Sequence, residues 1–173
     1  MSRLIASLAA LAITIAMPLA PVFADAGHGL DAVGSPALKG QGRVVRIEMT
    51  DNSYNLKNLT VKSGEVVRFV AVNKGTLLHE FNLNTSVAHA EHRPLMAMMT
   101  EHGMITTDKV ISTTMKMPNG TTMSHSEPNS ILLEPGKSSE ISWKFAKAGT
   151  LEISCNIPGH SESGMIVPVN VSR

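Results

Sequence analysis

The chain has 173 residues, a formal net charge of +1, 17% charged residues and 3% aromatic residues. This length is typical of one domain. The near-neutral charge gives no electrostatic attraction for nucleic acid, and so few aromatic side chains provide no stacking platform for bases. Binding of nucleic acid is therefore excluded from the expected functions.

Residues 1–24 are predicted to be a signal peptide. A basic start precedes an apolar run over residues 4–20, and residues 22–26 contain two overlapping small-residue cleavage sites. The alternative is a membrane anchor, since the apolar run approaches the length that spans a bilayer. Pro18 and Pro21, followed by small residues, favour cleavage. We expect an exported, periplasmic protein with no membrane span after cleavage.

Residues 25–42 are rich in Gly and Ala and are predicted to be a flexible arm before a single domain over residues 43–173. His28 lies in this arm. Cleavage after Asp25 would make residues 26–28 a copper(II)-chelating amino-terminal tripeptide. The preferred cleavage sites miss that register by one residue, so His28 is expected to be a flexible tail residue.

Short alternating segments separated by Gly, Pro and Asn turns predict strands through the domain. The segment 65–73 is apolar on both faces, which indicates a strand covered on both sides or an edge where two sheets meet. Trp143 is expected in the core. The regular spacing predicts an all-β sandwich or barrel. The predicted strands cover residues 43–50, 58–62, 65–73, 77–83, 130–134, 138–145, 150–155 and 165–171.

The loop between the last two predicted strands contains an unusual set of side chains. Cys155, the only cysteine, is followed at five-residue steps by His160 and Met165, with a turn at Pro158. One Cys, two His and a weak axial Met form the trigonal site of a blue-copper protein. The second imidazole must come from elsewhere, and His79 in the apolar segment 77–83 is the best candidate.

Each of these residues also has an ordinary structural interpretation. A lone Cys is usually a small buried hydrophobe, and a lone His in a strand is more often a core residue than a ligand. Zinc is a weaker competitor for the site, because it gains little from a thioether. A single Cys in an exported protein has no partner for an intramolecular disulfide, which favours a reactive or ligating thiol.

The spacing Cys-x4-His-x4-Met after a strand, with Leu-His-Glu-Phe around His79 and a strand pair over residues 61–73, resembles the cupredoxin family. The phrase IPGHSESGM, with a His/Met-rich insert, is similar to the CopI-type periplasmic cupredoxins linked to copper tolerance. The resemblance covers about residues 43–171. It implies a Greek-key β-sandwich with one type 1 copper ion bound by His79, Cys155, His160 and Met165.

The resemblance also implies a role for each ligand. Cys155 supplies the short covalent bond and the visible colour, His79 and His160 complete the trigonal plane, and Met165 is axial. We expect His160 to face solvent as the electron port. Many cupredoxins have Asn or Ser after the first His, where it helps to orient the Cys sulfur. Here Glu80 follows His79, so we expect different tuning of the copper site.

An insert over about residues 86–127 does not have the pattern of a strand. Residues 86–102 are predicted to be partly helical, with Pro94 interrupting the helix or opening a second one. Residues 112–126 are predicted to be a mobile loop. The insert contains seven of the eleven Met residues and four of the seven His residues: His89, His92, Met96, Met98, Met99, His102, Met104, Met115, Met117, Met123 and His125.

Two interpretations of the insert remain open. Pairs such as His92 with Met96, and Met98 or Met99 with His102, would place soft ligands on one helix face, where they suit an additional copper(I) ion. Alternatively, the Met residues are pliable fillers in a helix that packs over the sandwich.

The expected function is a periplasmic type 1 copper-binding protein, redox-active between Cu(I) and Cu(II), in copper tolerance and homeostasis. Its partners would be copper ions and a redox or copper-transfer protein. The alternative is a soluble electron-transfer cupredoxin that serves a respiratory or photosynthetic chain. No enzymatic activity is expected, since the sequence has no His-x-His pairs and no second cupredoxin domain for further copper sites.

Overall fold

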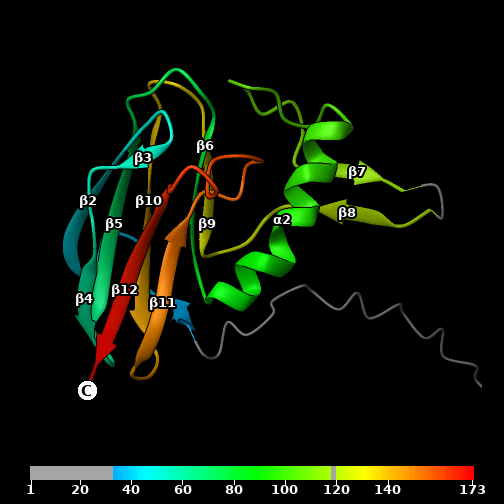
Figure 1. Ribbon diagram of the computed structural model, residues 1–173. Helices are drawn as coiled ribbons and strands as arrows, with labels where there is room; N and C mark the ends of the chain where they lie inside the picture. Colours follow the sequence, from blue (N-terminus) through cyan, green and yellow to red (C-terminus); the bar gives the residue numbers. More distant parts are fainter. Residues whose placement is uncertain (1–32, 118–119) are drawn as a thin grey trace, which may run out of the picture.

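The computed structural model describes residues 33–117 and 120–173, so the predicted signal peptide (1–24) and His28 lie outside the described residues. Two five-stranded sheets pack against each other, and one helix with a hairpin lies beside them (Figure 1). The first sheet has the order β1 (Gly34–Pro36), β10 (Ser138–Phe145), β5 (Val66–Asn73), β2 (Arg43–Thr50) and β3 (Ser53–Tyr54). The second has the order β4 (Leu59–Lys62), β12 (Ile166–Ser172), β11 (Gly149–Ser154), β6 (His79–Asn84) and β9 (Ser130–Leu133). This arrangement confirms the predicted all-β sandwich.

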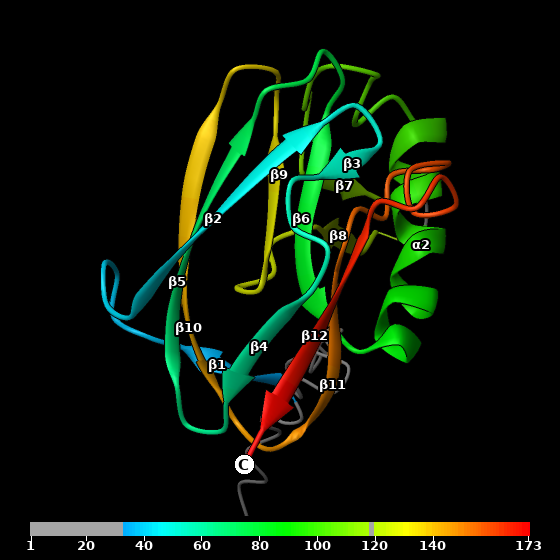
Figure 2. The same cartoon turned by 60° about the vertical axis from the view of Figure 1, so that its left-hand side comes forward.

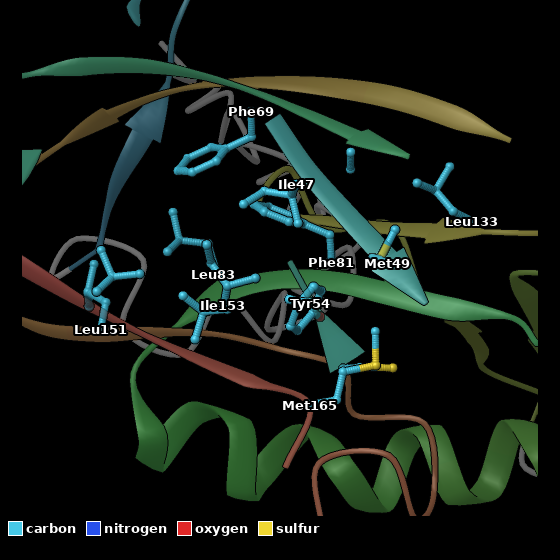
Figure 3. Packing of buried hydrophobic residues seen from close by; sticks show 14 of the residues in the cluster. Ile47, Met49, Tyr54, Phe69, Phe81, Leu83, Leu133, Leu151, Ile153 and Met165 are labelled. Carbon is cyan, nitrogen blue, oxygen red and sulfur yellow. The ribbon is translucent and has the colours of Figure 1, made fainter. Parts of the chain in front are cut away.

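The core lies between the two sheets and follows the alternation of their strands (Figure 3). Phe69 of β5 faces Phe81 of β6 with ring centroids 5.2 Å apart, and Phe145 of β10 lies 6.3 Å from Phe69. Trp143 is fully buried, as predicted, and its indole N–H donates to the carbonyl of Val33 over 3.3 Å. Alternate residues of strands from both sheets thus form one rigid apolar layer.

The short strand β1 corrects part of the predicted flexible arm. Gly34–Pro36 pairs antiparallel with β10, with Gly34 opposite Phe145. Gly34 has φ +141° and leaves no space for a Cβ beside the carbonyl oxygen of Lys144. Gly34 therefore allows β1 to approach β10 closely. The Gly-rich composition of the arm cannot by itself distinguish such a close approach from flexibility.

Strand β6 is buried on both faces, because one faces the core and the other faces the helix (Figure 2). Phe81 and Leu83 belong to the hydrophobic core. Glu80 and Asn82 point the opposite way, as the twofold alternation of a strand requires. A carboxylate is consequently placed, fully buried, on the outer side of the second sheet.

The helix α2 (Ser86–Glu101) begins at Thr85, whose hydroxyl accepts from the N–H of Ala88 over 3.2 Å. It ends before Gly103, which has φ +66°. Pro94 lies inside this single helix, so the predicted interruption is wrong. Proline removes one helical hydrogen bond, but the buried face of the helix packs on the sandwich and holds it together.

The second half of the insert forms a hairpin rather than the predicted mobile loop. Strands β7 (Thr114–Lys116) and β8 (Thr122–Ser124) pair antiparallel, with Met115 opposite Met123. The N–H of His125 then donates to the carbonyl of Thr113 over 2.8 Å. Residues rich in Thr and Ser suit strands as well as loops, so the weak periodicity was misleading. Among the described residues, no helix has the length and apolar character needed to cross a membrane.

Candidate metal centre

The loop after β11 closes on itself and brings its two ends together. The N–H of His160 donates to the carbonyl of Ile157 over 3.0 Å, at a turn in which Gly159 has φ +88°. At the base of the loop, the N–H of Cys155 donates to the carbonyl of Met165 over 3.2 Å. Met165 in turn donates its N–H to the carbonyl of His160 over 3.1 Å. These bonds close the loop and bring the main chain at Cys155, His160 and Met165 close together.

His79, at the start of β6, completes the group. The ligand atoms of His79, Cys155 and His160 all lie within 4.8 Å of one another. The Cys155 sulfur is 3.3 Å from Nδ1 of His160, and the two imidazole rings have centroids 5.1 Å apart with planes at 54°. Met165 is fully buried and belongs to the hydrophobic cluster that Figure 3 displays. The structure therefore places His79 beside Cys155 and His160, although more than seventy residues separate it from them in the sequence.

Asp51 orients the imidazole of His79. Its Oδ1 lies 3.3 Å from Nε2 of His79 and accepts from the N–H groups of Thr76 and Leu77 over 2.8 and 3.1 Å. Nδ1 of His79 is buried and has no hydrogen-bond partner. With Nε2–H donating to Asp51, Nδ1 keeps a free lone pair, and this atom is shielded from solvent. A buried nitrogen without a partner is costly, and a metal ion would satisfy it.

Burial controls the protonation of these ligands. It raises the pKa of the Cys155 thiol to about 12 and lowers the pKa of both His79 and His160. The imidazoles are therefore neutral at pH 7 and ready to bind a metal, whereas the thiol holds its proton. A metal that binds Cys155 must displace that proton.

The sulfur of Cys155 receives its hydrogen bond from the main chain of Glu80. The N–H of Glu80 donates to the sulfur over 3.3 Å. The carbonyl of Glu80 accepts from the hydroxyl of buried Tyr54 over 2.6 Å, which fixes this part of β6. Glu80 stands where many cupredoxins have Asn or Ser. This difference does not remove the hydrogen bond to the Cys155 sulfur, because the peptide N–H of Glu80 supplies it.

Asp51 and Tyr54 support the metal centre, but the sequence alone does not identify either of them. Both lie in a polar segment that predicts a turn, and neither has a spacing that connects it to His79 or Cys155. The only available signal is an acidic residue in a turn cluster, and that pattern is common on protein surfaces. Their roles depend on the packing of β3 and β6 in the two sheets.

Most of the His and Met residues of the insert do not form the predicted soft-ligand pairs. Met96, Met99 and Met104 are buried in the hydrophobic cluster, as the packing interpretation expects. His89 is buried with its Nε2 3.2 Å from the carbonyl oxygen of Glu152. The remaining exposed or half-buried members are Met98, His102, Met115, Met117 and Met123.

Two histidines of the insert do converge, and they meet at Glu80 rather than at a Met. His92 from α2 and His125 after β8 place their Nε2 atoms 3.1 and 3.2 Å from Oε1 of Glu80. Burial alone would raise the pKa of Glu80, but hydrogen bonds from His125 and His92 outweigh it and hold that pKa well below the usual range. Burial likewise opposes protonation of His92, yet Glu127 and Glu80 raise its pKa to about 10. The metal-free cluster therefore contains a buried ion pair.

The fold agrees with comparisons to known proteins. Residues 39–173 match the family described as the sulfocyanin (SoxE) domain. The chain is 41% identical over 157 residues to the copper-resistant cuproprotein CopI of Pseudomonas aeruginosa, covering 86% of each chain. It is 37% identical over 136 residues to the protein of the same name from Rubrivivax gelatinosus, covering 78% of this chain and 69% of that one.

Among solved structures, the chain is similar to auracyanin B, with a TM-score of 0.57 and 18% identity over 82% of this chain and 97% of that one. It is also similar to the "blue" copper protein auracyanin A of Chloroflexus aurantiacus, with a TM-score of 0.51 and 18% identity over 75% and 99% of the two chains. This structural likeness supports the fold. The match over residues 39–173 and the identity to CopI show that the chain belongs to the sulfocyanin (SoxE) domain family of cupredoxins, as a homologue of the CopI cuproproteins.

Proposed function

We propose that the chain is an exported copper-binding protein of copper resistance that holds one copper ion at His79, Cys155, His160 and Met165. The observation that carries this proposal is the convergence of His79, Cys155 and His160, together with the unpartnered Nδ1 of His79. Thiolate, imidazole and thioether suit copper in both redox states. The names of the relatives, which describe copper-resistant cuproproteins, support the biological role.

Each ligand has a role in this proposal. Copper, when bound, supplies a centre that cycles between Cu(I) and Cu(II). Cys155 and the two imidazoles would hold the copper, and the thioether of Met165 would be a further, weaker ligand. His160 is half-buried whereas His79 is fully buried, so electrons or ions would exchange at the His160 edge. A rigid sandwich behind the loop would keep the ligands in place in both redox states.

The proposed role is copper binding rather than catalytic turnover. In this proposal the mature protein is periplasmic, after cleavage of the signal peptide near residue 24. The alternative of a dedicated respiratory or photosynthetic electron carrier is not favoured, because three relatives are named for copper resistance. A partner protein that reduces the copper or receives it would dock near His160.

The test is a visible absorption spectrum of the protein with one equivalent of Cu(II), beside the Cys155→Ser variant. We expect an intense thiolate-to-copper band that is absent from Cys155→Ser and preserved in Ser163→Ala, a control in the same loop. A host strain that lacks the gene should regain growth on copper with the wild type but not with Cys155→Ser. A wild type without the band, or a Cys155→Ser variant that keeps it, would refute the proposed site.

A further inference from the structure

A second cluster of ligating side chains lies on the outer side of the second sheet, beneath α2. Glu80 of β6, His92 of α2 and His125 after β8 are 0%, 8% and 6% exposed. The two imidazole rings have centroids 5.1 Å apart with planes at 52°. His79 and His160 have almost the same mutual arrangement, at 5.1 Å and 54°. The fold therefore builds two similar histidine pairs, one beside a thiol and one beside a carboxylate.

The three facing atoms have the separations expected of ligands around a common ion. Nε2 of His92 and Nε2 of His125 lie 3.1 and 3.2 Å from Oε1 of Glu80, and 3.3 Å from each other. Nitrogen and oxygen ligands bound about 2.0–2.1 Å from one metal ion lie about 2.8–3.4 Å apart, for angles between a right angle and the tetrahedral angle. All three distances fall within that interval.

A network of hydrogen bonds alone accounts poorly for this arrangement. Oε1 of Glu80 faces His92, His125, the hydroxyl of Ser130 at 2.8 Å and the amide nitrogen of Asn82 at 3.2 Å. Four donors exceed what the lone pairs of one carboxylate oxygen accept with good geometry. The two Nε2 atoms also face each other at a distance where two N–H groups would repel. A cation between the three atoms would resolve both conflicts.

Groups around the cluster hold its members in position. Oε2 of Glu80 accepts from the main-chain and side-chain N–H groups of Asn156 over 3.0 and 2.8 Å. Nδ1 of His92 lies 3.5 Å from a carboxylate oxygen of Glu127. A carboxylate behind the distal nitrogen of a metal-binding histidine is the usual way in which proteins orient such a ligand.

We propose that Glu80, His92 and His125 bind a second metal ion, a divalent copper ion, at a site distinct from the thiolate centre. Two imidazoles and one carboxylate are harder ligands than a thioether, and the buried Met residues of the insert are occupied in the core. Such a set suits a divalent ion, and among first-row divalent ions Cu(II) binds nitrogen and oxygen sites most tightly. The site therefore differs from the copper(I) site that the Met residues of the insert predict.

The experiment is a titration of the metal-free full chain with Cu(II), in which bound copper is measured by equilibrium dialysis and the copper spectrum by electron paramagnetic resonance. We expect two copper ions per chain. The thiolate band should saturate with one ion, and the other should give a separate signal with hyperfine coupling to two nitrogens. His92→Gln and His125→Gln should each bind one ion and keep the thiolate band, while the control His102→Gln, at the exposed end of α2, should bind two.

This experiment separates the second site from the thiolate centre. Cys155→Ser should lose the band yet still bind one Cu(II) ion with the two-nitrogen signal, whatever the outcome for the proposed function. Binding of only one ion by the wild type would overturn the second site, even if the histidine variants fail to fold. Retention of two ions by folded His125→Gln would also overturn it. Displacement of the second ion by an equal concentration of Zn(II) would refute the assignment to copper.

Discussion

The peptide N–H of Glu80 donates to the sulfur of Cys155 over 3.3 Å, while the carboxylate of the same residue points to the opposite side of the sheet. Strand alternation makes this division of roles possible, because the main chain of β6 faces the loop and its even-numbered side chains face α2. A shift of β6 by one residue would reverse the faces and disrupt both clusters at once. The register of β6 against β11, with Ile153 opposite Leu83, therefore determines both.

Copper affinity at the thiolate centre should depend on pH through Cys155 alone. The pKa of this thiol is raised to about 12, whereas the pKa values of His79 and His160 are lowered, so only the thiol loses a proton on binding at neutral pH. The binding constant should rise about tenfold per pH unit between pH 7 and 9. Titration of the thiolate band against a competing chelator would measure this slope. A constant affinity across that range would contradict the prediction.

Asp51→Ala should weaken copper binding by about 10–100-fold, because the carboxylate that orients His79 is lost. Asp51→Asn keeps an acceptor for the His79 N–H and should retain most of the affinity. Asp108→Ala, whose carboxylate accepts from the hydroxyl of Thr106 and pairs with no histidine among the described residues, is the matched control. The measurement is again a chelator competition at fixed pH. Equal affinity in Asp51→Ala and the wild type would show that His79 needs no orienting partner.

Met99→Ala should lower the free energy of unfolding by about 2–5 kcal/mol, since it removes a fully buried side chain from the core and leaves a cavity. Met98→Ala, at a half-buried position on the same helix, should cost less. Chemical denaturation of the metal-free variants would give these values. Copper stoichiometry should be unchanged in both, and loss of a copper ion from Met99→Ala would restore the ligand interpretation.

Tyr54→Phe should lower the free energy of unfolding by about 1–3 kcal/mol, because the buried carbonyl of Glu80 loses its donor. The aromatic ring and its packing remain, so the variant should still fold and bind copper. Denaturation curves beside Arg46→Ala, which removes an exposed ion pair, provide the comparison. An effect no larger than that of Arg46→Ala would contradict the prediction.

The strands and the ligand loop could be predicted because their sequence patterns lie within a few neighbouring residues. The strands over residues 43–50 and 138–145 have the predicted bounds, and the turns near Pro158 and Gly164 lie within the few residues that bring Cys155 towards Met165. His79 is more than seventy residues from its partners, so it could be chosen only as the imidazole in an apolar strand-like segment, a choice that the family resemblance supported. Local periodicity and a known spacing thus account for the predictable part.

The second cluster could not be predicted, because it depends on packing between distant segments. Glu80 was interpreted through its neighbour His79, whereas its side chain belongs to the other face of the strand. His92 was paired with Met96 by helical spacing, although Met96 faces the hydrophobic core. The position of His125 depends on a hairpin whose Thr-rich sequence has little periodicity. Contacts of this kind become visible only when the helix is placed on the sheet.

The complete burial of Cys155 also has a consequence in an oxidising compartment. Disulfide exchange needs direct approach of one sulfur to another, and the Cys155 sulfur is covered by the loop and by β6. Its raised pKa further reduces the fraction of reactive thiolate. In the proposed periplasmic location, a metal-free molecule would therefore not form disulfide-linked dimers. A copper ion, far smaller than a protein thiol, could still reach the same sulfur beside the half-buried His160.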